Sequence, residues 1–304
     1  VLMYQNKTRN ANISIWAMGR TLSRLEERFT SYLEDPLFHI VIGDVTEEIQ
    51  IAEACDYVLH CASNTHPKSY ASDPIGTNIA GTQHILDYAV KANSEKVLFL
   101  STVEIYGENR GDLDKFTEDY CGYIDCNTLR AGYPEGKRAS ESLCQAYIQK
   151  YGIDVVIPRI SRTFGPTMLL SDSKASSQFI MNAVHKENIV LKSAGTQLYS
   201  YAYVADIVSA LLFLLVKGQK GEAYNVSNEH CDITLRTFAE TLANVAGTKV
   251  IHGEATAQEK QGFSKATKAL LDNQKIYALG WRPLYDSMEE PLKHTIKILE
   301  GSGN

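Results

Sequence analysis

Long apolar runs and clusters of basic residues are missing from this 304-residue sequence. No run approaches the roughly 20 apolar residues that cross a bilayer, and the longest, residues 210–216, is short enough for a buried helix. The 30 Lys and Arg residues are scattered and the net charge is −6. This charge balance argues against nucleic acid or an anionic membrane surface as a partner.

Cysteine is also scarce. Six cysteines in a chain of this length do not make a disulfide scaffold. Cys121 and Cys126 are close enough to share a metal ion, but no second pair of ligands follows them, so no metal site is expected. We therefore expect reduced thiols and a cytoplasmic enzyme.

Strand-like and helix-like segments alternate through the first two thirds of the sequence. Strands are expected at residues 13–18, 38–45, 57–62, 96–102 and 154–160, and amphipathic helices at 79–92 and 135–151. Apolar runs such as VLFL and VVI do not alternate with polar residues, which is typical of parallel strands buried on both faces. The pattern predicts an α/β fold with a doubly wound parallel sheet.

The pattern changes after about Thr163. Glycine and proline mark frequent turns there, and helices are expected at residues 204–216 and 235–246. A smaller carboxyl-terminal lobe is expected over the carboxyl edge of the sheet, where open α/β folds bind ligands. Residues 1–163 would form the sheet domain, and residues 164–304 mainly a substrate lobe, with some segments returning to the first domain.

A tyrosine and a lysine stand four residues apart at the start of a predicted helix, in Tyr133-Pro-Glu-Gly-Lys137. Residues at this spacing lie on one face of a helix. A lysine ammonium beside a phenol favours the phenolate, which can accept a hydroxyl proton while hydride leaves the same carbon. An accidental surface pair is the alternative interpretation.

A second polar group follows the predicted strand at 96–102. The segment Ser101-Thr102-Val103-Glu104-Ile105-Tyr106-Gly107 places the Thr102 hydroxyl and the Glu104 carboxylate at the carboxyl edge of the sheet. A polar turn at a strand end is the alternative, and the occurrence of the Tyr-Lys pair further along the chain favours a site.

Taken in order, these motifs resemble the extended short-chain dehydrogenases/reductases that modify nucleotide sugars, the NAD-dependent epimerase/dehydratase family. The resemblance covers nearly the whole chain. The pieces that carry it include GDV at 43–45, HCAS at 60–63, STVEIYG at 101–107, YPEGKRASESLC at 133–144, FGPTM at 164–168 and YSYAYVADIV at 199–208. The segments around FGPTM and YPEGKR are most similar to UDP-glucuronate decarboxylases and 4,6-dehydratases.

The resemblance implies a Rossmann-type fold in which residues 1–163 bind NAD. It assigns Tyr133 as the base, Lys137 as its activator and ligand of the nicotinamide ribose, and Thr102 as the group that hydrogen-bonds the sugar O4. The remaining residues that it places along the cofactor are Asp44 and Val45 near the adenine and the backbone of Cys61, Ala62 and Ser63. The implied partners are a UDP- or dTDP-sugar and a second copy of the chain, which would pair through the helices at 79–92 and 135–151.

The sequence departs from the family at several positions. The first glycine is Gly19, and residues 1–6 resemble the end of a first helix, so we expect the glycine-rich cofactor fingerprint to precede residue 1. Arg20 stands where an acid would contact an NAD ribose, which leaves NADP open beside NAD. Tyr199 replaces an arginine of many relatives, and Arg162 replaces an asparagine; we expect Arg162 to pair with the substrate diphosphate, and Tyr199 to belong to the substrate site.

The residues after Thr102 discriminate among the reactions of the family, which share a 4-keto intermediate. A 4,6-dehydratase needs an acid where this chain has Val103, and a 4-epimerase does not need Glu104. Decarboxylases keep a glutamate at the position of Glu104. The sequence therefore favours a UDP-glucuronate decarboxylase, with a 4-epimerase, a dTDP-glucose 4,6-dehydratase and a catalytically dead Rossmann sensor as alternatives.

Overall fold

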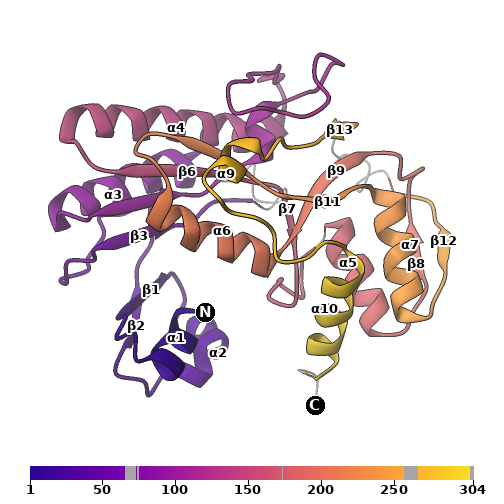
Figure 1. Cartoon of the computed structure of the whole chain (residues 1–304), viewed down its shortest axis with the longest axis horizontal. Helices are drawn as coiled ribbons and strands as arrows, with labels where there is room; N and C mark the ends of the chain where they lie inside the picture. Colours follow the sequence, from indigo (N-terminus) through magenta and orange to yellow (C-terminus); the bar gives the residue numbers. More distant parts are fainter. Residues whose placement is uncertain (66–72, 74, 173, 257–265, 302–304) are drawn as a thin grey trace.

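A parallel sheet in the order β10–β6–β4–β3 forms the centre of the molecule (Figure 1). The computed structural model describes residues 1–65, 73, 75–172, 174–256 and 266–301. The strands of the central sheet are β3 (Tyr57–His60), β4 (Lys96–Phe99), β6 (Val155–Ile160) and β10 (Ala223–Val226), and the short β5 (Ser101–Thr102) also pairs with β6. All of these pairs are parallel, as the unbroken apolar runs predicted.

Helices cover both faces of the central sheet. Helices α3 (Gly76–Ala92) and α4 (Gly132–Tyr151) pack side by side on one face, and α6 (Val204–Lys217) covers the other (Figure 1). Phe99 packs with residues of α3 and α4, whereas its neighbour Leu98 packs with residues of α6. A strand that is covered on both faces needs apolar side chains at successive positions, which explains the run VLF.

The amino-terminal strands form a separate two-stranded parallel sheet. Strand β1 (Ile15–Gly19) pairs with β2 (Phe38–Ile42), and α1 (Leu2–Arg9), α2 (Leu22–Phe29) and the short η1 (Thr30–Tyr32) pack around them. The sequence predicted one continuous sheet. In the described part of the chain no hydrogen-bonded strand pair joins β1 or β2 to the central sheet.

A cavity of about 190 Å³ lies between β1 and β3. Trp16 and Met18 of β1 line one side, and residues 57–60 of β3 line the other. The edges of β1 and β3 that face it have no strand between them in the described residues, so backbone hydrogen bonds do not connect the two sheets.

The second lobe is built around β9 (Leu198–Tyr203). It pairs antiparallel with β11 (Asn228–Thr234) and parallel with β7 (Arg162–Phe164) and β13 (Lys268–Ala269). The other elements beyond β6 are α5 (Ala175–Val184), β8 (Ile189–Leu191), α7 (Leu235–Ala246), β12 (Val250–His252), α9 (Gln274–Ala278) and α10 (Glu289–Gly301). The core of this lobe is rich in aromatic residues, and Phe164, Tyr201 and Phe238 pack together in it.

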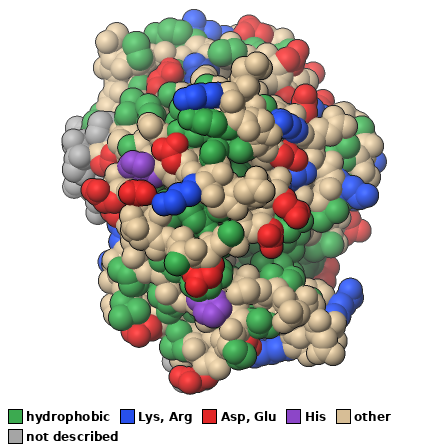
Figure 2. Space-filling model, turned by 90° about the vertical axis from the view of Figure 1, so that its left-hand side faces the viewer, with side chains coloured by type: hydrophobic (Ala, Val, Ile, Leu, Met, Phe, Trp, Pro, Cys, Tyr) green, Lys and Arg blue, Asp and Glu red, His purple; other side chains and the backbone are tan. Residues whose placement is uncertain are grey.

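Charges of both signs are mixed on the face of the molecule drawn in Figure 2, where Lys and Arg side chains are interspersed with Asp and Glu. Among the described helices, none combines the length and the apolarity that crossing a membrane requires.

Candidate active site

The hydroxyl of Thr102 lies at the carboxyl end of β5. The residue is buried, and its Oγ1 accepts a hydrogen bond of 3.3 Å from the backbone N–H of Glu104. Thr102 thereby caps the short helix η3 (Val103–Tyr106), because an N-cap hydroxyl satisfies a backbone donor that has no partner within the helix. The strand, the cap and the turn are therefore one local structure that places Thr102 and Glu104 together.

Tyr133 and Lys137 lie in the first turns of α4, one helical turn apart, as their spacing predicted. Both are buried. Lys137 Nζ donates a 2.7 Å hydrogen bond to the carbonyl oxygen of Leu100 and lies 4.6 Å from the centre of the Phe99 ring. Burial lowers the pKa of Lys137 to about 8, so its ammonium is present at neutral pH on the side of the helix that faces the strand end.

A buried ion pair holds α4 in this position. Arg159 of β6 donates from Nη2 to Glu141 Oε2 at 2.6 Å and from Nε to Glu141 Oε1 at 3.1 Å. Ser101 donates to the same carboxylate at 2.5 Å. The sequence reasoning did not single out Glu141 or Arg159. In the sequence, Glu141 is distinguished by its position one helical turn after Lys137, on the same face of the helix. No sequence pattern links Glu141 to Arg159.

Glu104 forms an ion pair with Arg130, whose Nη2 lies 2.8 Å from Glu104 Oε1. Arg130 belongs to the short helix η4 (Leu129–Ala131), which leads directly into α4. Arg130 was also missed, since only its place three residues before Tyr133 distinguishes it in the sequence. The side chain of Val103 packs in the core of the second lobe, where it is 5% exposed.

The residues expected beside the adenine lie just beyond β2, which ends earlier than the sequence predicted. Asp44 Oδ1 accepts hydrogen bonds from the backbone and hydroxyl of Thr46, both 2.9 Å long, and these bonds lower the pKa of the Asp44 carboxyl. Nη1 of Arg20, the residue after β1, lies 3.8 Å from Asp44 Oδ2. Val45 is buried, and a Cβ added to Gly81 of α3 would meet its Cγ2 at 2.8 Å.

The segment Cys61–Ser63 follows β3 at the same edge of the central sheet as Thr102. Ser63 donates a 2.5 Å hydrogen bond to Asn78 Oδ1 of α3. Asn78 is buried and its backbone oxygen accepts from Ser140 of α4 at 2.9 Å. Asn78 therefore connects the loop after β3 to both helices; the sequence offered no specific signal for it.

These residues fit the two ends of a dinucleotide, the nicotinamide ribose and the adenine. Tyr133 and Lys137 offer a phenol and an ammonium that could contact a nicotinamide ribose, and Asp44 lies at the carboxyl edge of the β1–β2 sheet. The middle of the dinucleotide needs a glycine-rich turn before a helix. Residues 1–304 contain no such turn ahead of β1, because their first glycine is Gly19, the last residue of that strand.

Arg162 and Tyr199 lie face to face in the second lobe. The Arg162 guanidinium carbon is 3.5 Å from the centre of the Tyr199 ring, a stacked cation–π contact. The Tyr199 hydroxyl donates a 2.8 Å hydrogen bond to the carbonyl oxygen of Ala266. Arg162 Nη1 is buried and has no hydrogen-bond partner among the described residues. A buried N–H without an acceptor is costly, and an anionic ligand would satisfy it.

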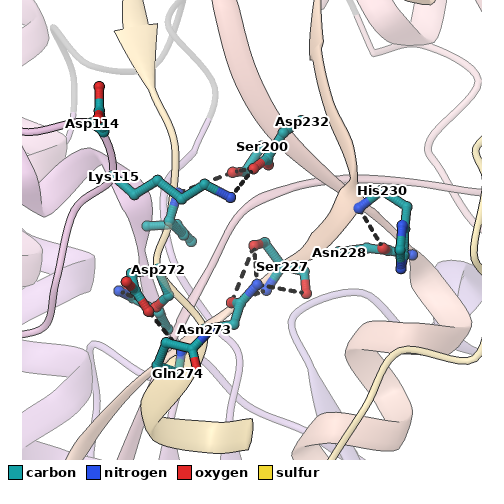
Figure 3. Close-up of polar contacts among 12 residues, drawn as sticks. Asp114, Lys115, Ser200, Ser227, Asn228, His230, Asp232, Asp272, Asn273 and Gln274 are labelled. Carbon is teal, nitrogen blue, oxygen red and sulfur yellow. Dashed lines mark hydrogen bonds and ion pairs between the residues drawn. The ribbon is translucent and has the colours of Figure 1, made fainter.

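The register of β9, which carries Tyr199, is held by a polar network (Figure 3). Ser200 donates to Asp232 Oδ1 at 2.5 Å, and Lys115 Nζ lies 2.7 Å from Asp232 Oδ2. Nearby, Ser227 and Asn273 share several hydrogen bonds that join the residue after β10 to the residue before α9. The Ser200–Asp232 bond joins β9 to β11 at the position next to Tyr199. No cluster of three or more His, Cys, Asp or Glu suited to a metal occurs within the described ranges.

The sequence is similar to those of several UDP-glucuronic acid decarboxylases. UDP-glucuronic acid decarboxylase 1 of Xenopus tropicalis is 31% identical over 276 residues, which cover 88% of this chain and 62% of that protein. UDP-glucuronic acid decarboxylase 6 of Arabidopsis thaliana is 30% identical, over 85% of this chain and 73% of that protein. The chain thus spans about 60% of the length of the first curated relatives that it matches.

Solved structures share the fold. The dTDP-glucose 4,6-dehydratase of Streptomyces venezuelae, solved with NAD, superimposes with a TM-score of 0.80 at 23% identity, over 98% of this chain and 90% of that one. The UDP-glucuronic acid 4-epimerase of Bacillus cereus gives 0.79 at 19% identity, over 98% and 94%. Residues 7–227 match the model of the NAD dependent epimerase/dehydratase family. With the Tyr-Lys helix, the threonine at the strand end and the Rossmann-type sheet, this match shows that the chain belongs to that NAD-dependent family of enzymes.

Proposed function

We propose that this chain decarboxylates UDP-glucuronate through a 4-keto sugar, with NAD as the cofactor. The observation that carries the proposal is the turn after β5, where Glu104 lies beside Thr102 while Val103 packs in the core. A dehydratase would need an acid in place of Val103, and an epimerase has no use for Glu104. The similarity to UDP-glucuronic acid decarboxylases points to the same reaction.

The first step is oxidation at C4 of the sugar. Thr102 and Tyr133 hold the 4-hydroxyl, and Tyr133 accepts its proton, assisted by the Lys137 ammonium. When bound, NAD would supply the hydride-transfer chemistry at C4. The residues that would hold it are Lys137 at the nicotinamide ribose, the backbone of Cys61–Ser63, and Asp44 with Val45 near the adenine.

The second step breaks the bond between C5 and its carboxylate. A ketone at C4 is β to this carboxylate, so the electron pair released with carbon dioxide is stabilised as an enolate. Protonation at C5, and reduction of the C4 ketone with return of the proton that Tyr133 had accepted, would then give UDP-xylose with no net oxidation. In this proposal the proton added at C5 comes from a water molecule that the Glu104 carboxylate orients, because Glu104 projects from the same turn as Thr102.

The substrate diphosphate binds to Arg162 in this proposal. The stacked Tyr199 ring holds the guanidinium, and the unpartnered Nη1 donates to a phosphate oxygen. Residues 1–163 then serve mainly the dinucleotide and residues 164–304 mainly the sugar nucleotide. Arg20 beside Asp44 is the residue that would contact the adenosine.

The products from UDP-glucuronate, UDP-glucose and dTDP-glucose, incubated with NAD and analysed by mass spectrometry, test the proposal. Loss of carbon dioxide from UDP-glucuronate is expected. Loss of water from dTDP-glucose would assign a dehydratase, and isomerisation without mass change an epimerase. If none of the three sugars reacts while NAD still binds, the chain is a sensor; the retained Tyr133 and Lys137 argue against that outcome.

We also propose that two copies pair through α3 and α4. A surplus of exposed apolar residues does not support this pairing, because most apolar side chains of both helices are buried or half-buried and outward positions such as Gln83 and Gln145 are polar. What supports pairing is a row of small exposed residues on α4, namely Ala139, Ser142 and Ala146, which allows close approach of a second helix. Sedimentation of a monomer at micromolar concentration would contradict it.

We infer a reducing compartment, the cytoplasm, from the cysteines. All six are unpaired, and burial raises the pKa of the Cys144 and Cys231 thiols to about 12, which keeps them protonated. Titration of the denatured protein, purified without reductant, should find six thiols. A lower number would indicate disulfides and contradict this inference.

A further inference from the structure

The ion pair between Arg130 and Glu104 joins two segments that are 26 residues apart in sequence. The Arg130 side chain is 34% exposed and that of Glu104 is 27% exposed, so the pair is partly withdrawn from solvent. Arg130 lies immediately before the helix of Tyr133, and Glu104 lies immediately after the strand that ends at Thr102. The pair therefore connects the two elements that carry the proposed chemistry.

The backbone of the η3 turn does not depend on Arg130. Arg138 of α4 donates 2.7 Å hydrogen bonds to the carbonyl oxygens of Ile105 and Gly122, and Thr102 caps the turn from its other end. These contacts fix the course of the chain. Arg130 instead binds the carboxylate at the end of the Glu104 side chain, which otherwise rotates about several bonds.

We propose that Arg130 is a positioning residue that holds the Glu104 carboxylate in place for the steps that follow C4 oxidation. Its guanidinium fixes one carboxylate oxygen and leaves the other for the sugar. It also supplies a positive charge where the carboxylates of Glu104 and of glucuronate would come together and repel each other. The inference rests on the proposed function, because that function gives Glu104 its role.

The test compares Arg130→Met, Arg130→Lys, Glu104→Gln and the Arg130→Met/Glu104→Gln double variant. Single-turnover absorbance of the reduced cofactor reports C4 oxidation, and trapped carbon dioxide reports decarboxylation. Arg130→Met should lower decarboxylation by up to about 100-fold through misplacement of Glu104, while C4 oxidation is retained and the reduced cofactor accumulates. Arg130→Lys should recover part of the loss, since it keeps the charge without the fork geometry.

The double variant separates positioning from a general structural role. If Arg130 acts through Glu104, the double variant should be no slower than Glu104→Gln alone. The matched control is Arg110→Met, which breaks a more exposed Arg–Glu pair with Glu108, 3.4 Å long, and should leave both signals unchanged. A melting temperature for each variant checks that it is folded.

Different outcomes contradict different claims. If the wild type releases carbon dioxide and Arg130→Met does so equally fast, the inference is wrong and the proposed function stands. Equal losses of C4 oxidation and decarboxylation in Arg130→Met would make Arg130 structural and also overturn the inference. If the wild type releases no carbon dioxide from UDP-glucuronate, the proposed function is wrong, and the inference that rests on it is wrong as well.

Discussion

Lys137 Nζ and the carbonyl oxygen of Leu100 are joined by a 2.7 Å hydrogen bond that fastens the helix of Tyr133 to the strand leading into Thr102. One of three ammonium hydrogens is used in this contact, so two are left for other acceptors. Lysine here serves two purposes. It orients α4 against the sheet, and it places a positive charge one helical turn from the phenol that is proposed as the base.

Replacing Tyr133 by phenylalanine should lower C4 oxidation by about 10²–10⁴-fold, because the proton acceptor is removed while the ring that fills the site remains. Stopped-flow absorbance of the reduced cofactor measures this step. Tyr151→Phe is the matched control, since it removes a phenol from the exposed end of the same helix. A Tyr133→Phe variant that oxidises UDP-glucuronate at the wild-type rate would show that another group is the base.

Lys137 should make stability depend on pH in an alkaline window. Desolvation lowers its pKa from 10.5 to about 8, so between these values the folded protein has lost a proton that the unfolded chain still binds. Stability contributed by this residue therefore rises as pH increases through the window, by up to about 3 kcal/mol. The free energy of unfolding of the wild type minus that of Lys137→Met should increase from pH 8 to pH 10. A difference that stays constant would contradict the assigned shift.

Gly81→Ala should destabilise the protein by about 1–2 kcal/mol. A Cβ at this position would meet Val45 Cγ2 at 2.8 Å, and the overpacking cost exceeds the gain of about 1 kcal/mol that alanine brings to a helix. Urea unfolding measures the change. Gly301→Ala in α10, where an added Cβ meets nothing, is the control. In a Val45→Ala background the Gly81→Ala penalty should shrink; an undiminished penalty would mean that the contact is not its cause.

Arg162→Met should weaken binding of UDP by about 10-fold or more, because a guanidinium contact to a phosphate is removed. Isothermal calorimetry with UDP measures this without any turnover. Tyr199→Leu should weaken binding as well, since the ring that carries the guanidinium is lost, whereas Tyr199→Phe keeps the ring and should bind like the wild type. Unchanged affinity in Arg162→Met would place the diphosphate elsewhere.

The local patterns were sufficient to predict the fold class. The non-alternating runs around Leu98 and Val156 require cover on both faces, and helices with apolar stripes follow each of them, so a parallel α/β sheet was the natural solution. The spacing of Tyr133 and Lys137 likewise placed both on one face of a helix. Each of these properties depends on residues within a few positions of one another, and the chain alone determines them.

Other features depend on contacts between distant parts of the chain, and only the tertiary structure decided them. The division of the sheet between β1 and β3 depends on which strand edges find a partner. Arg130 meets Glu104, and Arg159 meets Glu141, only because α4 packs across the ends of β5 and β6. A long charged side chain reaches many acceptors in an unfolded chain, and packing selects one of them. Sequence therefore determined the elements and the reactive side chains, and packing determined which partners hold those side chains in place.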